Sequence, residues 1–235
     1  MTFIELVALD IAGTTVDEGG TVYRVLADTV RALGAHPAPE QIEQWMGASK
    51  REAIGALLTA SGMPADDATV DAGFADFRAR LTDAYRTNPP TPFPGVADLF
   101  SQLRSAGIKV ALTTGFDRQV TDAVLESVGW DDRVVDAVVC SDDVSIGRPA
   151  PYLIFRAMER TGVIDVRRVL AAGDTVRDVE SGRNAGAAIV LAVTSGEVPA
   201  KTLAAAGPTQ VIDSVLGIPA VLAAGGQPLG ALVEG

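Results

Sequence analysis

Apolar runs and helical patterns alternate along most of this chain of 235 residues. The first run, residues 3–10, has the length and composition of a strand that is buried on both faces of a sheet. Strands that alternate with helices predict a mostly parallel sheet with helices on both faces. Further strands are expected at 108–113, 134–140, 169–172, 187–193 and 211–213, with helices at 118–128, 151–161 and 176–185 and a last helix after residue 213.

Residues 21–87 follow another pattern, in which apolar positions recur at helical spacing and no strand is indicated. A stiff, extended linker rich in proline follows at residues 88–95. Because the first strand must join the later sheet, the helical block is an insertion after that strand. We therefore expect an α/β protein with a Rossmann-like, doubly wound core (1–15 and 92–235) and an all-helical cap (16–91). The glycine-rich tail from residue 224 is expected to be loose.

Composition and charge narrow the range of partners. Hydrophobic residues make up 48% of the chain and the net charge is −11, which argues against nucleic acid and anionic membranes as partners. No basic leader and no apolar stretch of about 20 residues is present, so neither a signal peptide nor a membrane span is expected. The lone cysteine, Cys140, fits a reducing cytoplasm, and we interpret it as a core residue. The lone histidine, His36, lies in a predicted loop, which disfavours Ser-His and Cys-His mechanisms.

Polar residues follow several of the predicted strands, and in a parallel sheet such residues meet at one edge. Asp10 ends the first strand, and Thr114-Gly115, Ser141-Asp142-Asp143 and Gly173-Asp174 follow later ones. Arg148 comes slightly after the third of these strands, and Asp178 lies one helical turn after Asp174. Carboxylates, a hydroxyl and an arginine at one edge are typical of a site for Mg²⁺ and a phosphoryl group.

Each of these groups also has a simpler interpretation. Asp10 could be a nucleophile, a metal ligand, or only a cap for the next turn. Asp174 and Asp178 could hold a cation, or supply the acidity common at helix starts. Arg148 could hold a phosphoryl group or lie on the surface. Thr114 and Gly115 could hold phosphoryl oxygens or form a simple turn.

The helical block raises the same choice for three further residues. Lys50 lies on a predicted helix there, where a lysine is usually solvated. Trp45 and Met46, shortly before it, are most simply core residues.

Together these motifs resemble the haloacid dehalogenase superfamily over nearly the whole chain, and within it the phosphonatases (phosphonoacetaldehyde hydrolases) and phosphonatase-like hydrolases. The motifs are Asp10-Ile11-Ala12-Gly13-Thr14-Thr15, Thr113-Thr114-Gly115, Gly147-Arg148-Pro149 and Gly173-Asp174-Thr175-Val176-Arg177-Asp178. A fifth segment, Met46-Gly47-Ala48-Ser49-Lys50, matches a Met-Gly-x-x-Lys segment of the phosphonatase cap. In that family, its lysine forms a Schiff base with the substrate aldehyde.

The resemblance implies a role for each matching residue. Asp10 would attack phosphorus, and Lys50 would reach the substrate from the cap. The ligands of Mg²⁺ would be the Asp10 carboxylate, the Ala12 carbonyl and Asp174, with Asp178 nearby. Substrate would be held by Ala12, Met46, Thr114, Gly115 and Arg148. A homodimer formed through cap helices is also an expectation from the family.

The chemistry accounts for Ala12, which stands where typical superfamily members carry a second aspartate. A phosphate ester needs a proton on its leaving oxygen, and the second aspartate supplies it. The leaving carbon of a phosphonate needs an electron sink instead, and an iminium formed by Lys50 would be one. Burial beside Arg51 and Arg148 is expected to lower the pKa of Lys50, so that the amine can attack.

Two positions depart from the phosphonatase pattern: Ala53 replaces a cap histidine and Ile11 replaces a tryptophan. The predicted function is Mg²⁺-dependent cleavage of the C–P bond in a small carbonyl phosphonate. The alternatives are a phosphatase for a small ester, similar to phosphoglycolate phosphatase, and a 2-haloacid dehalogenase, which needs no cation. A degenerate binding module is disfavoured because the four motif residues are all present: Asp10, Arg148, Asp174 and Asp178.

Overall fold

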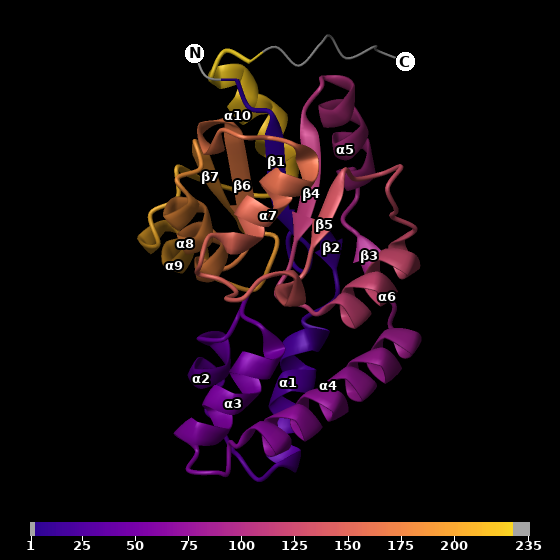
Figure 1. Ribbon diagram of the computed structural model, residues 1–235, viewed down its shortest axis with the longest axis vertical. Coiled ribbons are helices and arrows are strands. Elements are labelled where there is room, and N and C mark those ends of the chain that lie inside the picture. The colour runs from indigo at the N-terminus through magenta and orange to yellow at the C-terminus, as the bar shows by residue number, and fades with distance from the viewer. Residues whose placement is uncertain (1–2, 228–235) are drawn as a thin grey trace.

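A six-stranded parallel sheet forms the centre of the computed structural model, which describes residues 3–227 (Figure 1). The strand order is β5-β4-β1-β6-β7-β8, and every neighbouring pair is parallel. This confirms the predicted α/β class and doubly wound sheet. The strands are β1 (Leu6–Asp10), β4 (Lys109–Thr113), β5 (Ala137–Val139), β6 (Val169–Gly173), β7 (Ile189–Val193) and β8 (Gln210–Ile212).

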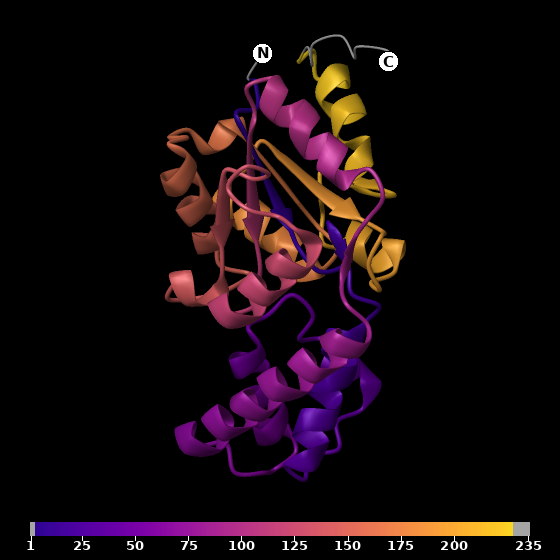
Figure 2. The same cartoon turned by 90° about the vertical axis from the view of Figure 1, so that its right-hand side faces the viewer.

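Apolar side chains of β1 alternate between the two faces of the sheet, which explains its continuous apolar sequence. Leu6 and Ala8 join the cluster that α7 (Tyr152–Thr161) covers. Val7 and Leu9 join the other cluster, with α5 (Val96–Ser105) and α10 (Ile218–Ala224). Figure 2 shows α5 and α10 on the opposite side of the sheet from α7.

Two of the remaining helices, α6 (Arg118–Val128) and α8 (Val176–Ala185), have the predicted bounds. The sequence prediction missed α5 and α9 (Ala200–Ala205). For α5 the signal was present, because four apolar residues at helical spacing bury one face of this helix. The short 3-10 helices are η1 (Ser141–Asp143), η2 (Val166–Arg168) and η3 (Val215–Gly217).

Four helices pack together below the sheet, and we call them the helical cap (Figures 1 and 2). They are α1 (Thr21–Ala32), α2 (Pro39–Glu43), α3 (Lys50–Ala60) and α4 (Asp67–Thr87). The chain enters and leaves the cap through two short antiparallel strands, β2 (Val16–Asp17) and β3 (Thr91–Pro92). The sequence showed neither strand, since two residues are too few for a periodic pattern. We propose that the core and the cap divide at these strands.

Other sequence expectations concern single residues and the tail. His36 is exposed, and Cys140 is buried as a free thiol, as predicted. Among residues 3–227, none of the helices combines the length and apolar character needed to cross a membrane. Most of the tail predicted to be loose, residues 228–235, lies outside the described residues.

Candidate active site

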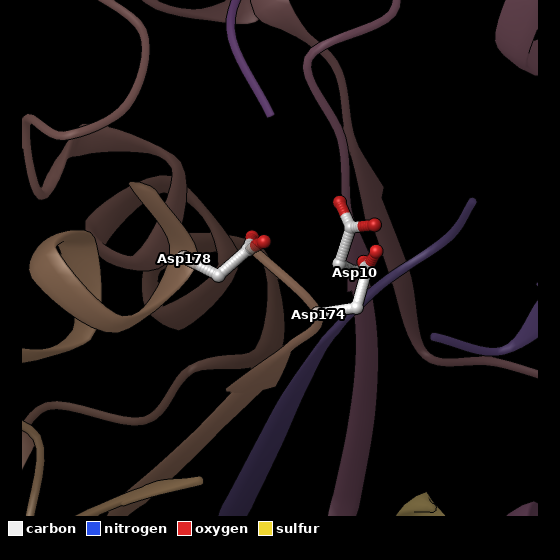
Figure 3. Close-up of side chains that lie close together, drawn as sticks. All are labelled: Asp10, Asp174 and Asp178. Carbon is white, nitrogen blue, oxygen red and sulfur yellow. The ribbon is translucent and has the colours of Figure 1, made fainter. Parts of the chain in front are cut away.

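Three buried carboxylates meet at the end of the sheet that faces the cap (Figure 3). Asp10 is the last residue of β1, Asp174 directly follows β6, and Asp178 lies in the first turn of α8. Because β1 and β6 are neighbours in the sheet, their ends bring Asp10 and Asp174 together. One oxygen of each carboxylate lies within 4.8 Å of the others. The structure therefore unites the three predicted acidic residues.

Arg148 reaches the same cluster and is itself buried. Its Nη1 atom lies 2.6 Å from Asp10 Oδ1 and 2.9 Å from Asp178 Oδ1. Its Nη2 atom donates to the carbonyl and the hydroxyl oxygen of Thr113, at 3.0 and 2.8 Å. These partners offset the cost of burying a guanidinium. Arg148 is therefore an internal part of the cluster, and not a surface residue.

Asp178 also supports the local backbone. One of its carboxylate oxygens accepts a hydrogen bond from the Thr175 amide at 3.0 Å, while the other contacts Arg148. Thr175 in turn caps α8 by accepting from the Asp178 amide at 3.3 Å. Asp178 thus stabilises the start of α8 and also positions Arg148.

The charge balance of the cluster favours a bound cation. Burial raises the pKa of Asp10 to about 7, although Arg148 pulls it down, and the nearby Asp178 raises it further. Burial and the charges of Asp10 and Asp178 also raise the pKa of Asp174. Three carboxylates face a single guanidinium, so a divalent cation would relieve their mutual repulsion.

The space around Asp174 fits this interpretation. A Cβ atom at Gly13 would lie 2.5 Å from Asp174 Oδ2, and one at Gly196 would lie 1.9 Å from it. Glycine at both positions therefore leaves room around the carboxylate. Thr14 donates its hydroxyl to Asp174 Oδ1 at 2.9 Å, which fixes the carboxylate. An all-oxygen set of this kind is what Mg²⁺ prefers, so the residues fit the predicted ion.

Lys50 is the first residue of α3, and its side chain is buried against aromatic rings. Its Nζ atom donates to the Ala48 carbonyl at 2.9 Å and lies 5.1 Å from the centre of the Tyr23 ring. Burial lowers the pKa of Lys50 to about 8, although the charges of Asp10 and Glu18 oppose this shift. Lysine side chains are usually solvated, but Lys50 is a buried amine near the carboxylates.

The expected cause of this shift needs one correction. Arg51 does not face Lys50, because it pairs with Asp67 at 2.9 Å and Asp71 at 2.7 Å on α4. The cations that lower the pKa of Lys50 are Arg148, as predicted, and Arg177.

The segment before Lys50 touches the core so closely that glycine is required on both sides. A Cβ atom at Gly115 would lie 2.8 Å from the carbonyl oxygens of Gly47 and Ala48. A Cβ atom at Gly47, whose φ is +77°, would lie 2.4 Å from Thr175 Oγ1. Thr114, beside Gly115, is buried, and its hydroxyl accepts from the Phe116 amide at 3.1 Å. Thr114 and Gly115 therefore lie under the Lys50 segment.

A cavity of about 180 Å³ is lined by residues at and beside β2, by the start of the cap and by Asp174 of the carboxylate cluster. Ala12 and Met46, both predicted to contact substrate, line it together with Tyr23, Glu18 and Asp174. Met46 is only partly buried, so its interpretation as a core residue is incomplete. The cavity gives a small molecule a place beside the cluster.

Asp142 and Asp143 do not join the cluster, contrary to the sequence prediction. Asp143 pairs with Arg118 at 2.6 Å and Arg160 at 2.7 Å, and Asp142 accepts from the Arg118 amide at 3.1 Å. Both aspartates lie in η1, where their partners come from α6 and α7. Position after a strand therefore did not decide where these side chains point.

Sequence reasoning missed Tyr23, Phe116 and Arg177. Arg177 donates to the Arg148 carbonyl at 3.0 Å, and its guanidinium lies 4.9 Å from the Trp45 ring. This contact explains the partial burial of Trp45 and joins α8 to the cap. Tyr23 and Phe116 lie outside the motifs, and Arg177 lies within the fourth motif but was given no role there. Only the fold brings these three side chains to the site.

The sequence model of the family described as haloacid dehalogenase-like hydrolase matches residues 4–186. This chain is a haloacid dehalogenase-like hydrolase. The motif resemblance and the prediction of an enzyme are thereby confirmed.

Phosphonoacetaldehyde hydrolases are among the relatives of this hydrolase. The one from Paraburkholderia xenovorans (strain LB400) is 30% identical over 209 residues, which cover 83% of this chain and 77% of that protein. The one from Bacillus cereus (strain AH187) is 31% identical over 194 residues, covering 78% and 73%. A solved structure of a phosphonoacetaldehyde hydrolase-like protein from Oleispira antarctica has a TM-score of 0.82 at 22% identity, covering 96% and 94%, and supports the fold.

Proposed function

We propose that this hydrolase cleaves the C–P bond of a small carbonyl phosphonate, phosphonoacetaldehyde or a relative, with the help of Mg²⁺. The observation that carries the proposal is the buried Lys50, whose lowered pKa of about 8 makes a neutral amine accessible beside the carboxylates. Ala12 supports it, because no acid stands there to protonate an ester oxygen. The names of the relatives point to the same substrate class.

In the proposed mechanism, the neutral Lys50 amine attacks the substrate carbonyl and, after loss of water, forms an iminium. A carboxylate oxygen of Asp10 then attacks phosphorus, and the electrons of the C–P bond move into the iminium to form an enamine. The products at this stage are an aspartyl-phosphate on Asp10 and an enamine on Lys50. Water later releases phosphate from the first, and protonation and hydrolysis release the carbonyl compound from the second.

The remaining residues position the phosphoryl group. Arg148 and the backbone at Thr114 and Gly115 would hold its oxygens. The cation, held by Asp10, the Ala12 carbonyl and Asp174 with Asp178 nearby, would neutralise negative charge on those oxygens. Arg148 also keeps the Asp10 carboxylate in place through the 2.6 Å contact between them.

Trapping of the iminium tests the proposal. The protein is incubated with Mg²⁺, phosphonoacetaldehyde and borohydride, and then analysed by peptide mass spectrometry. We expect a reduced adduct on Lys50, together with phosphate release in a parallel sample without borohydride. Phosphate release with no adduct would replace the proposal by a phosphatase mechanism. If neither signal appears, a panel of other carbonyl phosphonates follows, and failure of the whole panel overturns the proposal.

The pH dependence of C–P cleavage is predicted by the pKa of Lys50. Because the protonated amine cannot attack, kcat/KM is expected to rise with pH and level off above a midpoint of about 8. The measurement is a pH series at saturating Mg²⁺. A rate that is flat between pH 6.5 and 9 would contradict the assigned role of the amine. Hydrolysis of an aryl phosphate, which needs no amine, serves as the control.

A second candidate is a phosphatase for a small ester, in which Lys50 only binds substrate. It is favoured by the carboxylate cluster and Arg148, which would supply a nucleophile and a phosphoryl-binding cation without the lysine. A 2-haloacid dehalogenase fits less well, since that reaction leaves the cation-binding arrangement of Asp174 and Asp178 unused.

The variant Ala12→Asp distinguishes the two main candidates. It installs a proton donor for the leaving oxygen, so hydrolysis of unactivated phosphate esters is expected to increase by about 10²-fold. Cleavage of phosphonoacetaldehyde should not increase, because a carbon leaving group has no lone pair to protonate. Both rates are measured with matched protein concentrations. An increase in C–P cleavage would contradict the proposed mechanism, and no gain on esters would weigh against the phosphatase.

A further inference from the structure

Formation of an iminium on Lys50 requires a proton donor beside the amine. When the amine attacks, the carbonyl oxygen gains an electron pair and must be protonated before it can leave as water. The charges of Asp10 and Glu18 act on the Nζ atom, but its described hydrogen-bond and ring contacts are the Ala48 carbonyl at 2.9 Å and two rings, Tyr23 at 5.1 Å and Phe116 at 6.0 Å. Of these three groups, only the Tyr23 hydroxyl carries a proton that it can give.

The hydrogen bonding of Tyr23 leaves that proton free. The Gly47 amide donates to Tyr23 Oη at 3.2 Å, so the hydroxyl oxygen is held as an acceptor. Within residues 3–227, no hydrogen bond runs from this hydroxyl to another group. Tyr23 also lines the cavity of about 180 Å³ that contains Ala12 and Asp174. A substrate carbonyl in this cavity would be the missing acceptor.

Tyr23 is also fixed to the segment that carries Lys50. Its hydroxyl is bonded to Gly47, three residues before the lysine, and its ring lies against the ammonium group. Donor and amine therefore belong to the same part of the protein and are held next to each other within the cap. Burial raises the pKa of Tyr23, and the charge of Asp174 raises it further, so the phenol keeps its proton over the working pH range.

We propose that the Tyr23 hydroxyl is the proton donor to the substrate carbonyl oxygen during Schiff base formation by Lys50. The inference rests on the proposed function. As the bond between Nζ and the carbonyl carbon forms, the π electrons move to oxygen, which takes the phenolic proton. The Lys50 nitrogen, which is now positively charged, then gives one of its protons to the phenolate. In the dehydration step, the C–O bond breaks with its electron pair on oxygen, the phenol protonates that oxygen, and water leaves. Solvent water reprotonates the phenolate.

The variant Tyr23→Phe tests the proposal, because it keeps the ring against Lys50 and removes only the hydroxyl. We expect borohydride trapping on Lys50 and C–P cleavage to be slower by roughly 10²-fold or more. Hydrolysis of an aryl phosphate, which needs no Schiff base, should fall by a far smaller factor. A thermal melt checks that the variant is folded.

Two further variants sharpen the test. Tyr85→Phe is the matched control, because the Tyr85 hydroxyl is buried in the cap and has no hydrogen-bond partner among the described residues. It should trap like the wild type. Glu18→Gln tests a carboxylate that lines the cavity and whose charge acts on Lys50; this carboxylate accepts from the Val22 amide at 2.9 Å. Slow trapping in Glu18→Gln combined with normal trapping in Tyr23→Phe would overturn the assignment.

The outcomes separate this inference from the proposed function. If the wild type forms the Lys50 adduct and Tyr23→Phe forms it within twofold of the same rate, only the role of Tyr23 is overturned. If the wild type forms no adduct with any carbonyl phosphonate, the proposed function fails and the role of Tyr23 fails with it. An adduct in the wild type with a selective loss in Tyr23→Phe supports both.

Discussion

Replacing Lys50 with arginine is expected to abolish C–P bond cleavage, lowering kcat by a factor on the order of 10⁴ to 10⁶, the scale seen when an enzyme loses a covalent nucleophile. The variant keeps a cation next to the Tyr23 ring, but a guanidinium stays protonated and cannot attack a carbonyl. Electrostatic binding of the substrate by Lys50 would largely survive this change, whereas covalent catalysis would not. Steady-state release of phosphate from phosphonoacetaldehyde measures the effect.

The matched control is Lys109→Arg. Lys109 is exposed at the start of β4, where it pairs with Asp136 at 3.1 Å, far from any predicted chemistry. This variant should cleave the substrate like the wild type. Lys50→Arg should also retain most of its activity on an aryl phosphate, which shows that the phosphoryl site is intact. A C–P cleavage rate in Lys50→Arg equal to that of the wild type would eliminate the Schiff base.

Replacing Asp10 with asparagine is expected to eliminate phosphate release from phosphonates and from aryl phosphates alike, again by a factor on the order of 10⁴ to 10⁶. The side chain keeps its size, but an amide oxygen does not form an acyl phosphate. Because Lys50 and Tyr23 are unchanged, we expect borohydride to trap the Lys50 adduct still. The two covalent events are thereby separated, with the adduct formed and the phosphorus untouched.

The fold should tolerate the loss of this carboxylate. Arg148 keeps its contacts with Asp178 and Thr113, and the variant removes one of three mutually repelling groups. A thermal melt and the mass of the trapped peptide are therefore the proper controls. Phosphate release from Asp10→Asn within tenfold of the wild-type rate would exclude Asp10 as the nucleophile. Asp10→Asn without an adduct would show that this carboxylate also takes part in iminium formation.

Local patterns in the sequence predicted the parts of the fold that are long and periodic. The run around β1 predicted a strand buried on both faces, and the spacing in α6 and α8 predicted their bounds. The short strands β2 and β3 could not be predicted, since their pairing joins residues more than 70 positions apart through only two residue pairs. Helix α5 follows directly after the proline-rich linker and was missed, although its apolar residues recur at regular helical spacing.

The candidate site divides in the same way. Asp10, Asp174 and Arg148 lie in motifs whose place after a strand predicts where they meet. Asp143 follows a strand too, but it forms ion pairs with Arg118 and Arg160 instead of joining the cluster. The sequence alone does not show that these arginines lie beside it. Burial of Lys50 against Tyr23 depends on how helices of the cap pack, which is a property of the tertiary structure alone.

The insertion of the cap after β1 gives the proposed reaction a direction. Asp10 belongs to the sheet and Lys50 belongs to the cap, and the chain crosses between them only through the short pair β2 and β3. Bond cleavage would therefore leave the phosphoryl half of the substrate attached to one part of the protein and the carbon half to the other. Lifting of the cap at this stage would carry the two halves apart. Recombination of the fragments would then be prevented by distance, so the fold itself would make an otherwise reversible bond cleavage proceed one way.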